Sequence, residues 1–276
     1  MQSASSQPQA WLDLSGRVGV VTGAGRGIGA EAARQLASAG AAVAVLDCDA
    51  VAAADVAGEI ERRGGRAVGI AADVSREDEI RAACTQVRQE LGSCDVLVNN
   101  AALVGYAGPL MDGDLAQWNR MLSVNLTGAL LCTRAFGAQM IAGGRGGSII
   151  NVASICGHLP LPSGGAYSVG KAGLMMLARM LALELAQHGI RCNSVSPGLV
   201  RTPATEAAYD DAAVASARQQ MVPVGRVAGP QDLADVIVFL ASSRSGYING
   251  QDILVDGGLS QTLMGLVPKP TQPMRA

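Results

Sequence analysis

Short apolar segments alternate with stretches of helical periodicity along almost the whole chain, and this alternation restricts the fold more than any other feature. Seven segments have the length and composition of buried strands, at 17–23, 41–47, 67–74, 94–100, 147–154, 190–197 and 251–256. The stretches between them predict helices, at about 28–39, 56–64, 76–92, 115–140, 165–188 and 230–242. The pattern predicts an α/β fold, a doubly wound Rossmann-type sheet of seven mainly parallel strands with helices on both faces.

The chain shows no internal linker or repeat between residues 15 and 258, so we expect a single domain there. Residues 1–14 form a polar N-terminal extension. Residues 259–276 form a C-terminal tail that is either disordered or packed at a subunit interface. The least regular internal segment, 199–222, is a candidate lid.

Composition excludes several classes of function. The net charge is −2 and no run rich in Lys or Arg occurs, which argues against a nucleic-acid partner. No apolar stretch approaches the roughly 20 residues that cross a membrane, and the N-terminus does not resemble a secretory signal. Six cysteines without a C-x-x-C motif indicate reduced thiols in a cytoplasmic protein, and two isolated histidines predict no metal site.

A glycine-rich turn follows the first predicted strand. Gly23, Gly27 and Gly29 leave room for a sharp turn, for the close approach of a pyrophosphate and for packing of the next helix on the sheet. The start of that helix offers free N–H groups to the anion. The alternative is a purely structural connection, but the location between a strand and a helix favours a dinucleotide cofactor.

Asp47 ends the second predicted strand, where a carboxylate can accept hydrogen bonds from ribose hydroxyls. It would repel a 2′-phosphate by roughly 2 kcal/mol in water and by about 8 kcal/mol at an effective dielectric constant of 20. Arg26 in the turn could instead attract that phosphate. We therefore predict NAD, with NADP less favoured; the alternatives are a plain strand-end aspartate and a solvated arginine.

Tyr167 and Lys171 are four residues apart and share one face of a predicted helix. Lowering a tyrosine pKa from 10 to about 7 takes roughly 4 kcal/mol. A lysine ammonium ~4 Å away supplies about 4 kcal/mol at an effective dielectric constant of 20. Lys171, aided by the positive nicotinamide, would then keep Tyr167 partly ionised to take the hydroxyl proton of a secondary alcohol. Ser154, at the end of a strand, is either a turn residue or a donor to the substrate oxygen.

Four motifs in this order resemble the single-domain short-chain dehydrogenase/reductase family: TGAGRGIG (22–29), NNAA (99–102), YSVGK (167–171) and SPGLVRT (196–202). The resemblance spans about 15–258. It implies catalytic roles for Asn125, Ser154, Tyr167 and Lys171, with Asn125 holding a relay water to Lys171. It implies cofactor contacts from Gly23, Arg26, Gly27, Ile28, Gly29, Asp47, Asp73, Val74, Asn99, Ala101, Tyr167, Lys171, Pro197, Gly198, Val200 and Thr202.

Within this resemblance, Asp73 would bind the adenine amino group and Asn99 would shape the cofactor cleft. Val200 and Thr202 would hold the carboxamide. Ala102 replaces the glycine usual in the family, and a positive φ there would strain it. The family also implies a homo-oligomer, a tetramer, which agrees with the apolar run AGLMMLARMLALELA (172–186).

The substrate pocket implied by the resemblance is largely apolar, which favours an apolar or alicyclic secondary alcohol or its ketone. Its expected lining is Leu103, Val104, Tyr106, Ile155, His158, Leu159 and parts of 204–222. One alternative is an NADPH-dependent reductase of 3-oxoacyl groups on acyl carrier protein. A protein that senses the cofactor without turnover is a further alternative, which the complete catalytic set disfavours.

Overall fold

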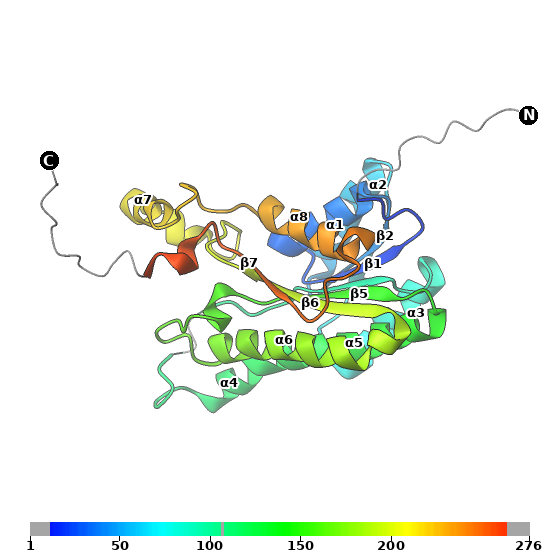
Figure 1. Cartoon of the computed structure of the whole chain (residues 1–276), viewed down its shortest axis with the longest axis horizontal. Coiled ribbons are helices and arrows are strands. Elements are labelled where there is room, and N and C mark those ends of the chain that lie inside the picture. The colour runs from blue at the N-terminus through cyan, green and yellow to red at the C-terminus, as the bar shows by residue number, and fades with distance from the viewer. Residues whose placement is uncertain (1–11, 106–107, 264–276) are drawn as a thin grey trace, which may run out of the picture.

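A seven-stranded sheet forms the middle layer of the molecule, in the order β3-β2-β1-β4-β5-β6-β7 (Figure 1). The computed structural model describes residues 12–105 and 108–263. The strands are β1 Val18–Thr22, β2 Ala42–Asp47, β3 Arg66–Ala71, β4 Val96–Asn99, β5 Gly147–Val152, β6 Ile190–Pro197 and β7 Asp252–Val255. Every neighbouring pair is parallel, so the expected doubly wound α/β fold is confirmed and the sheet is wholly rather than mainly parallel.

Helices cover both faces of the sheet. One layer contains α1 (Gly27–Ser38), α2 (Ala50–Arg62) and α8 (Pro230–Ala241) (Figure 1). The other contains α3 (Glu77–Glu90), α4 (Leu115–Leu122), α5 (Gly128–Gly143) and α6 (Gly165–Glu184). Alternate residues of each strand enter the two layers, because side chains of a strand point to opposite faces.

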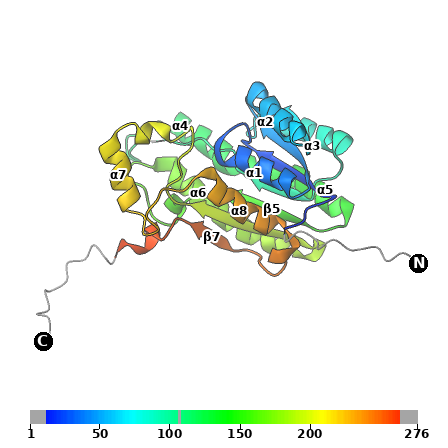
Figure 2. The same cartoon turned by 90° about the horizontal axis from the view of Figure 1, so that it is seen from above.

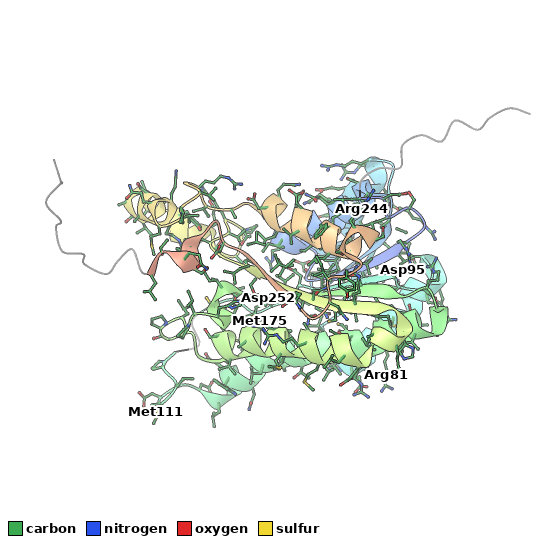
Figure 3. All side chains as sticks on the ribbon, in the orientation of Figure 1. Arg81, Asp95, Met111, Met175, Arg244 and Asp252 are labelled. Carbon is green, nitrogen blue, oxygen red and sulfur yellow. The ribbon has the colours of Figure 1, made fainter. Side chains whose placement is uncertain are left out.

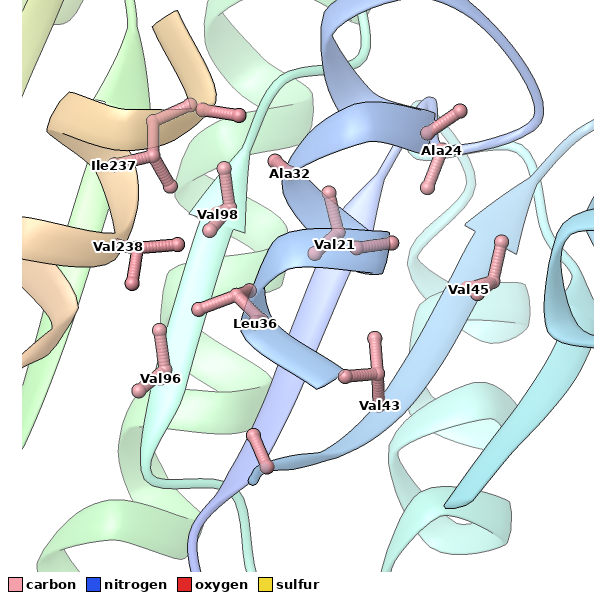
Figure 4. Close-up of a cluster of buried hydrophobic side chains, with 14 of the residues drawn as sticks. Val21, Ala24, Ala32, Leu36, Val43, Val45, Val96, Val98, Ile237 and Val238 are labelled. Atoms are coloured by element: carbon pink, nitrogen blue, oxygen red, sulfur yellow. The ribbon is translucent and has the colours of Figure 1, made fainter. Parts of the chain in front are cut away.

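The two apolar cores follow this alternation. Val21, Val43 and Val98 pack with Leu36 of α1 and Ile237 of α8 on one face (Figure 4). On the other face, Val20, Leu46 and Leu97 pack with Ile80 of α3 and Phe136 of α5. Small aliphatic side chains thus fill both cores, as the low aromatic content requires.

The predicted helix at 115–140 contains an interruption. Between α4 and α5, residues Ser123–Thr127 form a π-helical turn, which often occurs at functional sites. The helix predicted at 165–188 ends at Glu184 and is followed by a 3-10 turn at Ala186–His188. Further 3-10 turns lie at Ile155–Gly157, Ser243–Ser245 and Leu259–Gln261.

The candidate lid is more ordered than expected. It contains a 3-10 turn at Glu206–Tyr209 and the helix α7, Ala212–Gln220. The Asp211 side chain starts α7 by accepting hydrogen bonds from the N–H groups of Ala213 and Val214. Both views place α7 at one end of the molecule, beyond the carboxyl ends of the strands (Figure 2).

The strand order reverses between β1 and β4, so the connections after these two strands leave toward opposite sides. A crevice at this switch point is the usual ligand position in such sheets. Asn100, which follows β4, donates from Nδ2 to the carbonyl oxygens of Thr22 at 3.0 Å and Gly23 at 2.9 Å. The glycine-rich turn is therefore tied to β4. Among the residues described, no helix has both the length and the apolar character needed to span a membrane.

Candidate active site

A pocket of about 280 Å³ opens at the carboxyl ends of β1, β2 and β4. Its lining includes half of the residues predicted from the sequence, namely Gly23, Arg26, Gly27, Ile28, Asp47, Asp73, Val74, Ala101 and Thr202. The others lie outside this lining: Gly29, Asn99, Asn125, Ser154, Tyr167, Lys171, Pro197, Gly198 and Val200. The pocket volume suits part of a dinucleotide rather than a whole cofactor with its substrate.

The glycine-rich turn has the backbone that an anion site requires. Gly23 and Gly27 have φ values of 61° and 60°, which favour glycine. A Cβ on Gly23 would lie 2.7 Å from the Cα of Ala101, and one on Gly29 would lie 2.3 Å from the carbonyl oxygen of Gly23. Because no side chain caps the start of α1, its first N–H groups are available to a ligand. These residues fit a pyrophosphate group.

Asp47 lies at the pocket wall with 8% of its surface exposed. Its Oδ2 accepts a hydrogen bond from the N–H of Gly25 at 2.8 Å, and its Oδ1 accepts one from the N–H of Asp49 at 3.0 Å. The carboxylate is thus fixed by the turn and by the start of α2. Arg26 also lines the pocket, so both charges invoked for cofactor selectivity lie there.

Tyr167 and Lys171 lie close together on α6, as expected, but their burial shifts both pKa values, which the sequence argument did not consider. Lys171 is 3% exposed, and its Nζ lies 5.7 Å from the ring centre of Tyr167. The lysine donates to the carbonyl oxygen of Val152 at 2.7 Å. Burial lowers the pKa of Lys171 to about 8. In the protein alone, burial also raises the pKa of Tyr167, against the expected lowering, and a hydrogen bond with Ser154 acts in the opposite direction.

Ser154 begins the 3-10 turn after β5 and is buried next to Tyr167. Its Oγ accepts a hydrogen bond from the N–H of Cys156 at 3.1 Å, which caps the turn. The hydroxyl hydrogen stays available for the tyrosine or for a substrate oxygen. Ser154 therefore caps a turn and contacts Tyr167, and donation to a substrate oxygen stays a prediction.

Asn125 lies in the π-helical turn and is 1% exposed. Its Oδ1 accepts from the N–H of Leu103 at 2.7 Å, and its Nδ2 donates to the carbonyl oxygen of Leu103 at 2.9 Å. Both polar atoms of the amide thus bind the backbone after β4. The contact anchors the wall of the pocket, and the relay water expected at Asn125 stays a prediction.

The segment after β6 approaches the pocket through Thr202, whose hydroxyl lies 3.2 Å from that of Thr205. Val200 forms a parallel bridge with Ala228, behind the lining. Pro197 ends β6, and a Cβ on Gly198 would lie 2.7 Å from the Cα of Asp256. This segment is therefore held in place by Pro197, Gly198 and Val200.

Ala102 is not strained. Among the residues that the structure describes, Ser163 is the one non-glycine residue with a positive φ, 58°. Alanine therefore replaces the usual glycine without a backbone penalty.

Most of the residues expected to line the substrate pocket lie within the described ranges. Leu103 and Val104 line the pocket and are exposed, as is Leu159. Tyr106, expected there as well, lies outside the described residues. His158 is not a free residue at the rim of the pocket. Its Nε2 lies 2.7 Å from Oδ2 of Asp252, and the residue is not part of the pocket lining. Within the described ranges, no three His, Cys, Asp or Glu side chains gather as a metal site would require.

Comparison with known proteins identifies the family. The model of the enoyl-(acyl carrier protein) reductase family matches residues 23–260. Cis-4-hydroxycyclohexanecarboxylate dehydrogenase of Sinomonas cyclohexanicum is 41% identical over 88% of this chain and 96% of its own length. D-threitol dehydrogenase of Mycolicibacterium smegmatis is 37% identical over 89% and 93%.

A solved structure gives the same result. A gluconate 5-dehydrogenase from Burkholderia cenocepacia, in complex with NADP and tartrate, superimposes with a TM-score of 0.85. The identity is 36%, over 91% of this chain and 97% of that one. The chain belongs to the short-chain dehydrogenase/reductase family. As a member of this family it is an oxidoreductase that acts on alcohols.

Several residues that line the pocket of this short-chain dehydrogenase/reductase were not predicted from the sequence, and two of them, Asn100 and Arg120, bear on its function. Asn100, not Asn99, lines the pocket. Asn99 is buried behind it and donates from Nδ2 to Oδ1 of Asn151 at 2.9 Å, which links β4 and β5. Asn99 is the last residue of β4 and Asn100 follows the strand, and their side chains bind different partners: Asn151 for Asn99, and the carbonyl oxygens of Thr22 and Gly23 for Asn100. The motif alone did not show which one faces the ligand.

Arg120 is the second residue missed. It extends from α4 to the wall of the pocket and forms an ion pair with Asp73 at 3.0 Å. Burial alone would raise the pKa of Asp73, but hydrogen bonds from Ser75 and Arg120 hold it below its usual value. No motif marks an arginine 47 residues away as the partner of this aspartate.

Asp252 is a third unpredicted residue of this short-chain dehydrogenase/reductase. Besides His158, its carboxylate accepts hydrogen bonds from the hydroxyls of Ser194 at 2.5 Å and Ser196 at 2.8 Å. The Oγ of Ser196 also contacts the sulfur of Met175, so Asp252 and Met175 lie close together between β7 and α6 (Figure 3). This network ties the segment after Ser154 to the edge of the sheet.

Proposed function

We propose that this enzyme is an NAD-dependent dehydrogenase that interconverts a secondary alcohol on an alicyclic or polyol substrate with its ketone. The observation that carries the cofactor preference is the Asp47 carboxylate, fixed at the pocket wall by the N–H groups of Gly25 and Asp49. A fixed negative charge there favours ribose hydroxyls and disfavours a 2′-phosphate.

The cofactor supplies hydride chemistry when bound, at its nicotinamide ring. Tyr167 takes the hydroxyl proton of the alcohol, or returns it to the ketone oxygen. Ser154 donates to the same oxygen and stabilises the negative charge that develops on it. Lys171 provides a positive charge beneath the tyrosine, since a pKa of about 8 leaves it mostly protonated at neutral pH. Asn125 keeps the pocket wall at Leu103 in place.

The substrate class rests on the apolar residues Leu103 and Val104 and on the relatives. One relative is named for a hydroxycyclohexanecarboxylate and another for D-threitol. A ring that carries a secondary alcohol suits the apolar side chains of Leu103 and Val104 in the pocket lining, and the polyol class rests on the relative alone.

The test is a set of steady-state assays with NAD⁺ and NADP⁺ in parallel, on cyclohexanols, hydroxycyclohexanecarboxylates, polyols, steroids and 3-oxoacyl thioesters. We expect turnover of an alicyclic alcohol or polyol, with kcat/KM at least about tenfold higher for NAD⁺. Asp47→Asn removes the charge but keeps an acceptor oxygen, so it should lower this preference. NADPH-dependent reduction of 3-oxoacyl thioesters as the best reaction would reject the proposal.

The proposal includes a homo-oligomer, a tetramer, formed by the single catalytic domain at 15–258. Met176, Met180 and Leu183 of α6 are exposed. A second copy of the chain could cover this apolar face. Light scattering coupled to size-exclusion chromatography tests it: Met180→Glu with Leu183→Glu should yield smaller species, and a monomeric parent protein would contradict it.

A further inference from the structure

The wall of the pocket near Asp73 contains a fork formed by Arg120. One guanidinium nitrogen donates to Oδ2 of Asp73 at 3.0 Å, and the other donates to the hydroxyl oxygen of Ser75 at 2.7 Å. Ser75 in turn donates to Oδ1 of Asp73 from its hydroxyl at 2.7 Å and from its N–H at 2.9 Å. The three residues form a closed hydrogen-bonded ring around one carboxylate.

The hydrogen bonds of the ring leave one acceptor position of the Asp73 carboxylate unused. A carboxylate offers two lone pairs on each oxygen. Both positions on Oδ1 of Asp73 are used by Ser75, and one position on Oδ2 is used by Arg120. One acceptor position on Oδ2 remains. Because Arg120 and Ser75 fix the plane of the carboxylate, the direction of this last acceptor is fixed as well.

The surroundings of this acceptor suit a flat heterocycle. Ala72, Val74 and Val124 provide apolar walls, and Arg120 lines the pocket with half of its side chain exposed. A guanidinium plane also stacks on aromatic rings. Arg120 and Val124 are four residues apart and lie on one face of the continuous helix formed by α4 and the π-helical turn.

We propose that Arg120 determines the base specificity of the cofactor site, by holding the Asp73 carboxylate so that its remaining acceptor receives the exocyclic amino group of adenine. This inference rests on the proposed use of an adenine-containing nicotinamide cofactor. Arg120 acts through Asp73 and is a positioning residue. The site then rejects a base that presents a carbonyl oxygen at the same place, because two acceptors would face each other.

The probe is nicotinamide hypoxanthine dinucleotide, in which a carbonyl oxygen replaces the adenine amino group. Binding of its reduced form and of NADH is followed by fluorescence titration, so the readout does not depend on turnover or on the substrate. We expect the enzyme to bind NADH about tenfold more tightly than the hypoxanthine analogue, the range of a hydrogen bond to a charged group.

Arg120→Gln should reduce this preference to about twofold or less, because Oδ2 of Asp73 then loses the donor that fixes the direction of its remaining acceptor position. Ser75→Ala removes the hydroxyl that links Arg120 to Oδ1 of Asp73, and it should also reduce the preference for NADH. The test therefore stays decisive if one of the two variants folds poorly. Arg76→Gln is the matched control. It removes a neighbouring arginine that pairs with Asp78 and Glu79 and does not line the pocket, and it should keep the preference.

Three results would overturn the inference: equal binding of the two dinucleotides by the parent enzyme, an unchanged preference in Arg120→Gln and Ser75→Ala, or an equal loss in Arg76→Gln. Failure of the proposed function is recognised separately. If NADPH binds and NADH does not, the same comparison made with NADPH and its hypoxanthine analogue still tests Arg120.

Discussion

The Nζ of Lys171 lies 5.7 Å from the ring centre of Tyr167 and donates to the carbonyl oxygen of Val152 at 2.7 Å. The lysine is thus held beneath the tyrosine by the end of β5. Burial raises the pKa of Tyr167 and lowers the pKa of Lys171 to about 8. Both pKa shifts favour the uncharged forms of the tyrosine and the lysine. Ionisation of the tyrosine therefore depends on further positive charge from the bound cofactor.

Tyr167→Phe removes the proton carrier and leaves the shape of α6 unchanged. We expect kcat to fall by a factor of about 10² to 10⁴, the usual contribution of a positioned acid or base. Binding of NADH, measured by fluorescence titration, should change little. Substantial turnover in this variant would assign proton transfer to another group.

Lys171→Met tests how the burial of the lysine affects the free energy of unfolding. Because its pKa falls from 10.5 to about 8 on folding, the folded protein binds fewer protons than the unfolded chain between these pH values. The free energy of unfolding of the parent protein should therefore rise with pH across this window, relative to the variant, by about 3 kcal/mol.

The measurement is denaturant unfolding of both proteins, without cofactor, at several pH values from 7 to 10. Cysteines titrate in the same range, but they are common to both proteins and cancel in the difference. A difference that does not vary with pH would mean that Lys171 keeps its ordinary pKa in the folded protein.

Gly29→Ala and Gly58→Ala form a matched pair. A Cβ on Gly29 would lie 2.3 Å from the carbonyl oxygen of Gly23 and 2.4 Å from Nδ2 of Asn100. The turn must shift, so we expect a loss of about 1–3 kcal/mol in stability and at least tenfold weaker NADH binding. Gly58 lies inside α2 with no atom within 4 Å of an added Cβ.

Gly58→Ala should stabilise the protein by about 1 kcal/mol, because alanine is the better helix former, and should leave NADH binding unchanged. Thermal unfolding and fluorescence titration check both variants. If the two substitutions had the same effect on NADH binding, the close packing at Gly29 could not be its cause.

Tyr209→Phe should preserve or increase stability. The guanidinium carbons of Arg201 and Arg218 lie 5.4 Å and 4.8 Å from the centre of its ring. Its hydroxyl is buried and has no hydrogen-bond partner in the described part of the chain. Since an unpaired buried hydroxyl costs about 1–3 kcal/mol, its removal should raise the free energy of unfolding by about 1 kcal/mol.

Tyr209→Leu is the control, because it removes both cation–π contacts and should destabilise the protein. Denaturant unfolding of the two variants distinguishes the hydroxyl from the ring. A clear loss of stability in Tyr209→Phe would show that the hydroxyl makes a contact in solution.

The strand pattern and the family motifs were sufficient to predict the sheet, the glycine-rich turn and the proximity of Tyr167 and Lys171. Each depends on local sequence: the apolar strands, the glycines at 23, 27 and 29, and the spacing of residues on α6. The spacing of two side chains carries no information on how deeply both are buried, so it did not reveal that burial raises the pKa of Tyr167 in the protein alone. Ionisation of the tyrosine with cofactor bound stays a prediction.

The unpredicted features depend on contacts between distant residues. Arg120 meets Asp73 across 47 residues, and Asp252 meets His158 across 94 residues. The π-helical turn at Asn125 was also not visible, since one extra residue in a turn hardly changes the apolar pattern of a helix. These contacts follow from the assembled sheet and not from any motif.

The hydrogen bond between Asp47 and the N–H of Gly25 has a consequence for how cofactor use can change by mutation. Replacement by alanine would remove the charge but also release the loop amide, so such a mutant gains tolerance of a phosphate while losing the shape that binds it. Asparagine keeps one acceptor oxygen, which can serve the N–H of Gly25, and loses the one that serves the N–H of Asp49. A lineage of this enzyme that moves to another cofactor therefore has its most accessible path through asparagine, with the positive charge of Arg26 already in place.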